Sequence, residues 1–564
     1  MQFKDYEYSR PDLDALKQNF ENLVSQFSQA NSMEEQNQTI AQINDLRNNF
    51  DTMYNLAYIR HTINTKDELY EKENNFFNAN LPKFQVVVND YYKALVNSKY
   101  KNELEKLWGP QLFRIAEMTC KTLDDQIVDE LAKENQLASD YNRLKASAEI
   151  DFKDKTYNLT GLIPFMEDDN RETRKAASIA HWNFFEKNKA EFDKFYDDLV
   201  KVRHGIAQKL GYNNFVELGY NRMLRSDYSA KDIAQFRSLV HKYIVPLATE
   251  LRQRQAKRID AVDYKHFDMG YQFKTGNPTP KGSPDWIIEN GKKMYAELSK
   301  ETGDFFNYML DRELMDVENK KGKAGGGYCT YIPNQQSPFI FSNFNGTSGD
   351  IDVLTHEAGH AFQVFESRNF TLPEYQWPTY EACEIHSMSM EFFTWPWMDS
   401  FFKEDTEKYK FQHLASAILF LPYGVAVDEF QHWVYENPNA KPEERRMEWK
   451  NIEAKYLPHL DYDGHPFLEA GGYWQKQGHI YEMPFYYIDY TLAQICALQF
   501  WNKAQTDKEA SFADYLHLCK EGGSRSFLEL VEFANLKSPF EESTMVEILK
   551  PVKAYLDSVD DAAL

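Results

Sequence analysis

Cysteine is scarce in this chain, and its spacing excludes two common uses of the thiol. Five cysteines occur among 564 residues, and no two of them form a Cys-x-x-Cys pair. A small protein held together by disulfides and a dithiol redox protein both need paired cysteines. The odd number and the wide spacing therefore argue against a disulfide framework.

The sequence also lacks the segments that direct a chain into or across a membrane. Its first residues, MQFKDYEYSR, contain neither the basic nor the apolar segment of a secretory signal. The longest apolar stretch, from Leu414 to Val427, is interrupted by Ser416, Pro422 and Gly424, so that it is too short to span a bilayer. We therefore expect a cytoplasmic protein with no membrane partner.

Basic residues are outnumbered, which disfavours binding to nucleic acid. The chain has 64 Lys and Arg against 87 Asp and Glu, a formal net charge of −23. A field of this sign repels phosphate backbones. Hydrophobic residues make up 42% of the chain and charged residues 27%, as in a globular protein with a sizeable core. The composition gives no indication of an oligomeric state.

Glycine and proline are nearly absent from the N-terminal region. No glycine precedes Gly109, and no proline lies between Pro11 and Pro82. Apolar residues recur there every three or four positions, which is the period of an amphipathic helix. Long helices with few turns predict a stack of antiparallel helices. We assign residues 1–150 to an N-terminal helical lobe.

A change of pattern marks the start of a second region, residues 151–564, which we expect to be catalytic. From Ala148 the segment AEIDFKDKTYNL alternates apolar and polar residues, as a hairpin does. Helical periodicity resumes after it. Further on, the runs YCTYIP and PFIFSNF predict two short strands shortly before Asp350.

The segment from Asp350 to Glu366 contains the order H-E-x-x-H, formed by His356, Glu357 and His360. On a helix, residues four apart differ by about 40° in azimuth and one turn in height, so both imidazoles face one point. This spacing supplies two of the roughly four ligands of a zinc ion. Glu357 lies about 100° from His356, where its carboxylate can act as general base toward metal-activated water.

A catalytic zinc site needs a third protein ligand, and the stretch TYEACEIHSMSMEFFTW offers several candidates. Glu384 and Glu391 lie within about 20° of each other on one helical face, whereas His386 is about 200° from Glu384. Glu381 lies one turn before Glu384 and is a rival ligand. The spacing favours Glu384 but leaves both carboxylates open.

The segment HEAGHAF, followed by the pattern E-x-x-S-x-x-x-E, resembles the thimet oligopeptidase and oligoendopeptidase F family of zinc peptidases. The resemblance extends back through GGGYCTYIPNQQSPFIFSNFNGT and covers most of the chain from about Lys155, whereas the first 150 residues match only in helical character. It implies that His356, His360 and Glu384 bind one zinc ion per chain. It also implies a mainly α fold, with two helical lobes around a deep substrate channel and a small β-sheet beside the zinc helix.

The family pattern also includes a cluster of His and Tyr residues near the end of the catalytic core, matched here by QGHIYEMPFYYIDYTLAQ. The resemblance implies that His479, Tyr486 and Tyr490 are catalytic, with phenols that stabilise the oxyanion. The two tyrosines are four residues apart on one helical face. Pro484 suits the first turn of that helix, which leaves His479 on the preceding loop. The spacing between the His and the Tyr residues differs from the thimet type.

These features predict a zinc-dependent endopeptidase that hydrolyses internal bonds of short oligopeptides, with Glu357 as general base and acid. A zinc carboxypeptidase of a related helical fold is an alternative, and it would need a cation to hold the substrate carboxylate. The candidates for that cation are Arg222, Arg225, Arg368 and Arg525. A non-catalytic helical binding protein would carry the motif by accident, and its lack of zinc would reveal it. The other histidines, His413 among them, have no partner at ligand spacing and are expected in surface or core roles.

Overall fold

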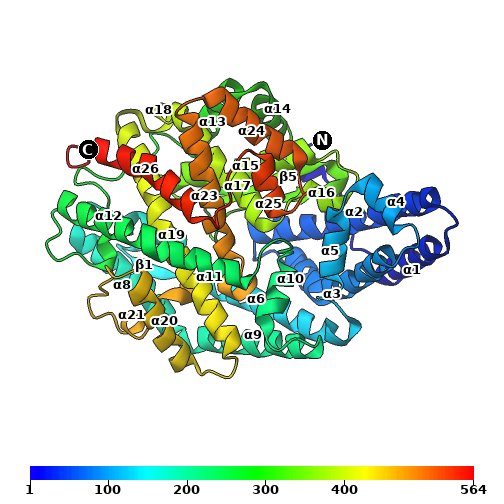
Figure 1. Ribbon diagram of the computed structural model, residues 1–564. Coiled ribbons are helices and arrows are strands. Elements are labelled where there is room, and N and C mark those ends of the chain that lie inside the picture. The colour runs from blue at the N-terminus through cyan, green and yellow to red at the C-terminus, as the bar shows by residue number, and fades with distance from the viewer.

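Helices make up most of the protein, whose computed structural model describes residues 1–564. The α-helices are numbered α1 to α26 along the chain, with most of them labelled in Figure 1, and five short strands accompany them. None of the helices combines the length and the apolar character needed to cross a membrane. The expected mainly helical fold, with a small β-sheet beside the H-E-x-x-H helix, is confirmed.

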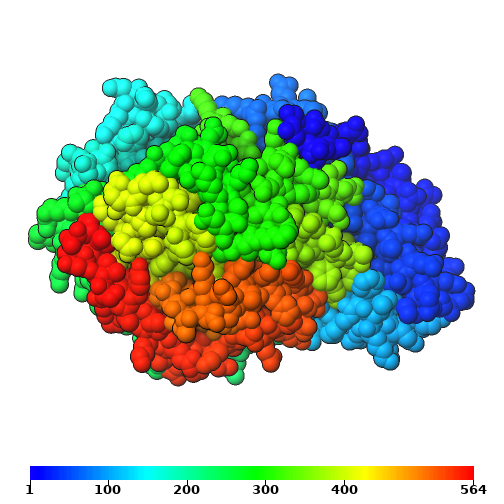
Figure 2. Space-filling view, turned by 90° about the horizontal axis from the view of Figure 1, so that it is seen from above, coloured from blue at the N-terminus to red at the C-terminus, as the bar shows by residue number.

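The first five helices pack together at one end of the molecule, in blue in Figures 1 and 2. Their bounds are α1 (Leu13–Gln29), α2 (Met33–Ile63), α3 (Glu68–Val96), α4 (Lys101–Trp108) and α5 (Gln111–Thr119). Asp12, Ser32 and Asp67 cap the first three by accepting hydrogen bonds from backbone N–H groups. These helices, together with Leu372 and Tyr375, share a core of 18 buried residues, separate from the main core of 104.

A short hairpin follows α6 (Val128–Ala146). Strand β1 (Ile150–Phe152) pairs antiparallel with β2 (Lys155–Tyr157), where the alternating pattern predicts a hairpin. The two turn residues, Lys153 and Asp154, have φ angles of 45° and 63°. Two successive left-handed residues are what a two-residue hairpin turn requires.

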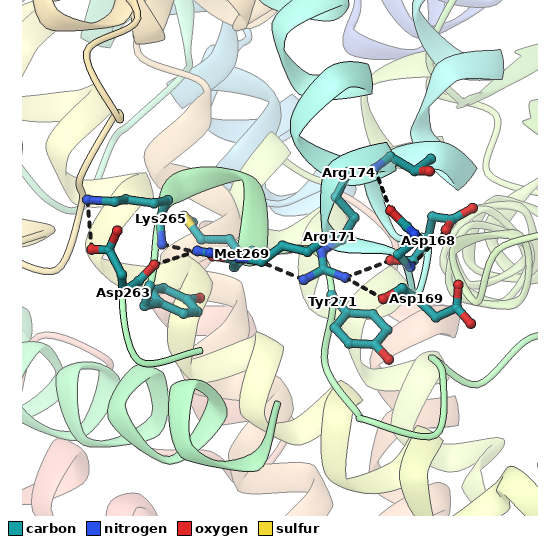
Figure 3. Close-up of polar contacts among 12 residues, drawn as sticks. Asp168, Asp169, Arg171, Arg174, Asp263, Lys265, Met269 and Tyr271 are labelled. Atoms are coloured by element: carbon teal, nitrogen blue, oxygen red, sulfur yellow. Dashed lines mark hydrogen bonds and ion pairs between the residues drawn. The ribbon is translucent and has the colours of Figure 1, made fainter. Parts of the chain in front are cut away.

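The chain then returns to helices. Their bounds are α7 (Leu159–Met166), α8 (Arg171–Lys187), α9 (Lys189–Lys209), α10 (Phe215–Arg222), α11 (Ala230–Leu239), α12 (Val245–Arg258), α13 (Pro284–Leu298) and α14 (Lys300–Asp311). Polar contacts tie the start of α8 to the segment after α12 (Figure 3). Arg171 and Arg174 both bond the fully buried Asp268, and Arg171 also donates to the carbonyl oxygen of Asp263. Because the buried carboxylate of Asp268 is fully paired by the two guanidinium groups, we interpret the network as structural.

A three-stranded sheet precedes the H-E-x-x-H helix. It consists of β3 (Met315–Glu318), β4 (Tyr328–Ile332) and β5 (Ser337–Phe344), in the order β3-β5-β4. The central strand β5 is almost wholly buried and pairs parallel with β3 and antiparallel with β4. The two strands predicted from YCTYIP and PFIFSNF are therefore confirmed, and β4 lies at an edge of the sheet.

Helix α15 (Gly349–Ser367), which carries H-E-x-x-H, follows the sheet, and eleven further helices complete the chain. They are α16 (Pro373–Gln376), α17 (Tyr380–Phe393), α18 (Asp399–Phe402), α19 (Thr406–Glu436), α20 (Pro442–Tyr456), α21 (Pro466–Glu469), α22 (Gly478–Glu482), α23 (Tyr487–Ala504), α24 (Lys508–Glu521), α25 (Phe527–Phe533) and α26 (Glu542–Ser558). Helix α17 packs against both α15 and α23 near the centre of Figure 1. The two helices that carry the candidate metal ligands therefore lie against each other.

Candidate metal centre

Helices α15 and α17 approach closely because a glycine faces their contact. A Cβ atom at Gly359 would lie 2.6 Å from the carbonyl oxygen of His386 and 2.6 Å from the Cα of Ser387. Any larger residue would hold the two helices farther apart. The glycine of HEAGH thus lets His356 and His360 reach the side chains of α17.

Three donor atoms from these helices converge on one point. The Nε2 atoms of His356 and His360 lie 3.2 Å and 3.3 Å from Oε2 of Glu384, and all three donors lie within 4.8 Å of one another. A tetrahedral ion with bonds of roughly 2.0–2.1 Å holds neighbouring ligand atoms about 3.4 Å apart. Two imidazoles and a carboxylate are also a donor set that zinc prefers. The residues present therefore fit a zinc ion.

The charges around these donors favour a cation at their centre. Burial lowers the pKa of His356, but its contacts with Glu384 and Glu391 outweigh burial and raise that pKa well above its usual value. Burial raises the pKa of Glu384, yet the two imidazoles hold it well below the usual range. Surroundings that hold positive charge on imidazole beside an ionised carboxylate also stabilise a divalent cation.

The rival ligands on α17 point elsewhere. Oε1 of Glu381 accepts a hydrogen bond from Tyr228 at 3.1 Å, and Glu381 is not among the converging donors. Burial raises the pKa of Glu381 to about 8, which disfavours the ionised form that a metal needs. Nδ1 of His386 bonds the carbonyl oxygen of Ala382 at 2.7 Å. Of the open alternatives, the geometry favours Glu384.

A chain of hydrogen bonds supports His356 from behind. Nδ1 of His356 donates to Oε1 of Glu391 at 2.7 Å, and Nε2 of His413 donates to the other oxygen of Glu391 at 2.8 Å. The indole N–H of Trp395 donates to Nδ1 of His413 at 3.1 Å. Such carboxylate–imidazole contacts fix the tautomer and orientation of a metal-binding histidine. His413 is buried, in line with the expected surface or core role, and α19 places it against Glu391, a contact that no spacing in the sequence indicates.

The carboxylate of Glu357 is buried beside the donors and incompletely paired. The residue is 6% exposed, and its Oε2 has no hydrogen-bond partner. Burial raises the pKa of Glu357, and the nearby imidazoles of His356 and His360 only partly offset this effect. A free carboxylate oxygen next to the metal ligands can accept a proton, as a general base does.

His479, Tyr486 and Tyr490 gather next to Glu384. The phenol of Tyr486 donates to Oε1 of Glu384, while Ser387 donates to Oε2 at 2.8 Å. Nε2 of His479 and the hydroxyl of Tyr490 lie 3.1 Å apart. Burial raises the pKa of both phenols well above the usual value and lowers that of His479 to about 4. Near pH 7 both phenols are thus protonated donors and the imidazole is neutral.

The backbone that carries these side chains differs from expectation. His479 lies in α22 and not on a loop, and α23 begins too late for Pro484 to belong to its first turn. Phe485 lies between α22 and α23 and has a left-handed backbone conformation, with a φ of 70°. Its N–H donates to the side chain of Gln431 at 2.9 Å, and its carbonyl oxygen accepts a hydrogen bond from Arg225. These contacts hold the left-handed turn that directs the next residue toward the metal centre.

The four arginines considered as anchors for a terminal carboxylate are all engaged elsewhere. Arg225, for example, is fully buried in an ion pair of 2.7 Å. Arg222 contacts Glu134, and Arg225 contacts Asp489. Arg368 donates to the carbonyl oxygen of Phe365, and Arg525 contacts Glu521. Three of the four are thus paired with a carboxylate, and Arg368, whose partner is a neutral carbonyl oxygen, is the one candidate of this set left for the carboxypeptidase alternative.

Two ranges of the sequence match known family descriptions. Residues 3–123 match the Peptidase M3 N-terminal domain, and residues 289–548 match Peptidase family M3. The second range contains α15, α17 and α23, which contribute the side chains of the metal centre.

Individual relatives agree with these matches. A solved structure of PZ peptidase A with an inhibitor is 57% identical, with a TM-score of 0.99 over 100% of both chains. Chromosomal oligoendopeptidase F of Lactococcus lactis subsp. cremoris is 28% identical over 35% of this chain and 31% of its own length. An oligoendopeptidase F homologue of Borreliella burgdorferi is 23% identical over 70% of this chain and 66% of its own length. The alignments span less than two thirds of these two curated relatives.

Proposed function

Because the chain belongs to peptidase family M3, a family of metallo-oligopeptidases, we propose that it is a zinc-dependent endopeptidase that hydrolyses internal bonds of short oligopeptides. One observation carries the proposal. The donor atoms of His356, His360 and Glu384 converge beside the unpartnered carboxylate oxygen of Glu357. This arrangement combines a set of metal ligands with a base that is not itself a ligand.

In the proposed reaction, His356, His360 and Glu384 would hold one zinc ion per chain. When bound, zinc supplies a Lewis acid that polarises a carbonyl group and makes water more acidic. Glu357 accepts a proton from the attacking water and then delivers it to the nitrogen of the leaving amine. The carboxylate is restored at the end of each turnover, so that one residue serves as base and acid.

The phenols of Tyr486 and Tyr490 would donate hydrogen bonds to the oxyanion that forms on the attacked carbonyl. Their raised pKa values support this role, since a donor must keep its proton. Tyr486 bonds Glu384 in the structure and would have to turn toward the substrate. The neutral imidazole of His479 lies against Tyr490 and would orient its hydroxyl.

The edge strand β4 offers a place for the substrate backbone. It starts directly after Gly327, where a Cβ atom would lie 3.3 Å from Oε1 of Glu357. An extended peptide added to this edge would therefore pass close to the proposed base. Main-chain pairing would give affinity with little dependence on side chains. We also propose that residues 1–150 and 151–564 form two lobes that enclose this path as a channel, and that the enzyme works in the cytoplasm.

The test is cleavage of a blocked peptide of about 8 to 12 residues, with fragment masses recorded in the presence and absence of a chelator. We expect internal cleavage that the chelator abolishes. The variant Glu357→Gln should keep its zinc but lose nearly all turnover, because it removes the base and no ligand. Glu366→Gln, on the same helix, is the matched control and should remain active.

Other outcomes would contradict the proposal in different ways. Substantial activity in Glu357→Gln would refute the mechanism. Trimming only at a free carboxyl end would support the carboxypeptidase. A protein without zinc and without cleavage would be a helical binding protein.

A further inference from the structure

The hydrogen-bond chain behind the metal centre ends on Trp395, and the donor at that end decides where His413 carries its proton. Trp395 lies just after α17 and is 7% exposed, while His413 lies on α19 and is 8% exposed. The indole nitrogen of Trp395 lies 3.1 Å from Nδ1 of His413. On the other side of the ring, Nε2 of His413 lies 2.8 Å from Oε2 of Glu391.

The chemistry of these two contacts assigns the proton on His413. An indole N–H donates hydrogen bonds and never accepts them, so Nδ1 of His413 must be the acceptor and carries no hydrogen. The ring proton is therefore on Nε2, which donates it to Glu391. In this arrangement His413 is a neutral imidazole. A second proton, on Nδ1, would set two buried N–H groups against each other and leave both without an acceptor.

The charged groups that face His413 favour the opposite state. Burial lowers the pKa of His413, but Glu391 from α17 and Asp352 from α15 outweigh burial and raise it. The remaining titratable group at the ring is Tyr409, which stacks on His413 and donates to Asp352 at 2.7 Å. Burial raises the pKa of Tyr409 well above its usual value, so that this phenol is uncharged. Without the indole of Trp395, the two carboxylates would therefore favour a charged imidazolium at His413.

The charge of His413 matters because Glu391 also bonds the proposed metal ligand His356. Nδ1 of His356 donates to the other oxygen of Glu391 at 2.7 Å. Beside a neutral His413, the carboxylate acts on His356 with its full negative charge, which makes this imidazole a better donor to a metal ion. An imidazolium at His413 would offset that charge and would add a positive charge behind a site for a cation.

We infer that Trp395 is a positioning residue of the metal centre, whose indole N–H keeps His413 neutral so that Glu391 acts with its full charge on His356. The inference rests on the proposed zinc-peptidase function and extends the metal centre to a side chain three hydrogen bonds away from His356. Zinc affinity should then depend on Trp395 only at pH values where His413 can take a second proton.

The first experiment measures the zinc affinity of Trp395→Phe by competition with a chelator at about pH 6 and about pH 8, on either side of the ordinary pKa of histidine. Relative to the wild-type protein at the same pH, we expect the affinity to stay within about threefold at the higher pH and to fall about tenfold at the lower pH. Trp501→Phe is the matched control, because Trp501 packs against Trp395 while its indole nitrogen has no hydrogen-bond partner. It should bind zinc as the wild-type protein does at both pH values.

The second experiment separates the charge of His413 from the packing of Trp395. In His413→Gln the side-chain amide offers one donor for Glu391 and one acceptor for Trp395, but it cannot take a second proton. Adding Trp395→Phe to His413→Gln should therefore cause no extra loss of zinc affinity at the lower pH. His413→Gln alone should follow the pH dependence of the wild-type protein, and this comparison needs no change at Trp395.

Several results would overturn the inference. They are an unchanged zinc affinity in Trp395→Phe at both pH values, an equal loss at both, and a loss at the lower pH that persists beside His413→Gln. The last two would show that Trp395 serves packing alone. If His413→Gln bound zinc more tightly than the wild-type protein at the lower pH only, His413 would already be charged in the wild type, and the inference would fail even if Trp395→Phe did not fold. A wild-type protein that bound no zinc would refute the proposed function, and this inference with it.

Discussion

Replacing Gly359 by alanine tests whether the close approach of α15 and α17 builds the metal centre. The added Cβ would lie 2.6 Å from the carbonyl oxygen of His386, 2.6 Å from the Cα of Ser387 and 3.0 Å from the Cβ of Met390. Two of these three atoms belong to the backbone and cannot turn away as a side-chain tip can. The helices themselves must separate.

The size of the effect follows from these contacts. Ordinary van der Waals contact begins near 3.4 Å, so the helices must move apart by about 0.8 Å. Metal–ligand distances tolerate changes of only about 0.2 Å, whereas the Glu384 oxygen now lies 3.2 Å and 3.3 Å from the two imidazole nitrogens. Overpacking costs about 1–3 kcal/mol. If the metal-free protein relieves this strain, zinc binding weakens by about 5- to 150-fold.

Competition with a chelator of known affinity measures this change directly, and thermal unfolding with and without zinc shows whether the fold survives. Gly205→Ala is the control, because this helical glycine on α9 has no atom within 4 Å of the added Cβ. It should leave zinc affinity unchanged and stabilise the fold by about 0.5–1 kcal/mol. If Gly359→Ala kept wild-type zinc affinity while losing stability, the glycine would serve packing alone.

Four further outcomes are expected. Glu384→Ala should lose its zinc in metal analysis while Glu381→Ala keeps it, and the reverse result would make Glu381 the ligand. Glu391→Gln should weaken zinc binding about 10- to 100-fold in chelator competition, since it loosens His356 without removing a ligand; an unchanged affinity would contradict this support. Burial raises the pKa of Glu134, but the charges of two nearby arginines outweigh burial and lower that pKa to about 2. The ionised Glu134 therefore stabilises the fold fully above about pH 4.5, and this stabilisation is lost as the pH falls toward 2. Glu134→Gln should therefore lower the free energy of unfolding by roughly 3 kcal/mol at pH 7, and urea titrations that show the same deficit at pH 3 would refute this. A given bond should be cut in a blocked peptide of about 10 residues but resist in an unfolded, reduced protein, and comparable rates would refute the enclosed channel.

The sequence by itself determined the features that depend on neighbours along the chain. The recurrence of apolar residues every three or four positions predicted the long helices, and the alternating segments predicted the hairpin and two strands of the sheet. The order H-E-x-x-H placed His356 and His360 on one face of a helix, because the helical repeat relates residues four apart. Local patterns of this kind predict the same secondary structure in any fold, so these features could be predicted without knowledge of the tertiary structure.

The tertiary structure decided which side chains from distant segments meet. Spacing left Glu381 and Glu384 open, and the packing of α17 against α15 and α23 turns Glu384 toward the imidazoles. No pattern pointed to His413, because α19 brings it to Glu391 from a separate part of the sequence. The left-handed turn at Phe485 likewise depends on partners from distant segments, Gln431 in α19 and Arg225 between α10 and α11. Contacts between remote segments leave no periodic trace in a single sequence, and only the packed fold brings them together.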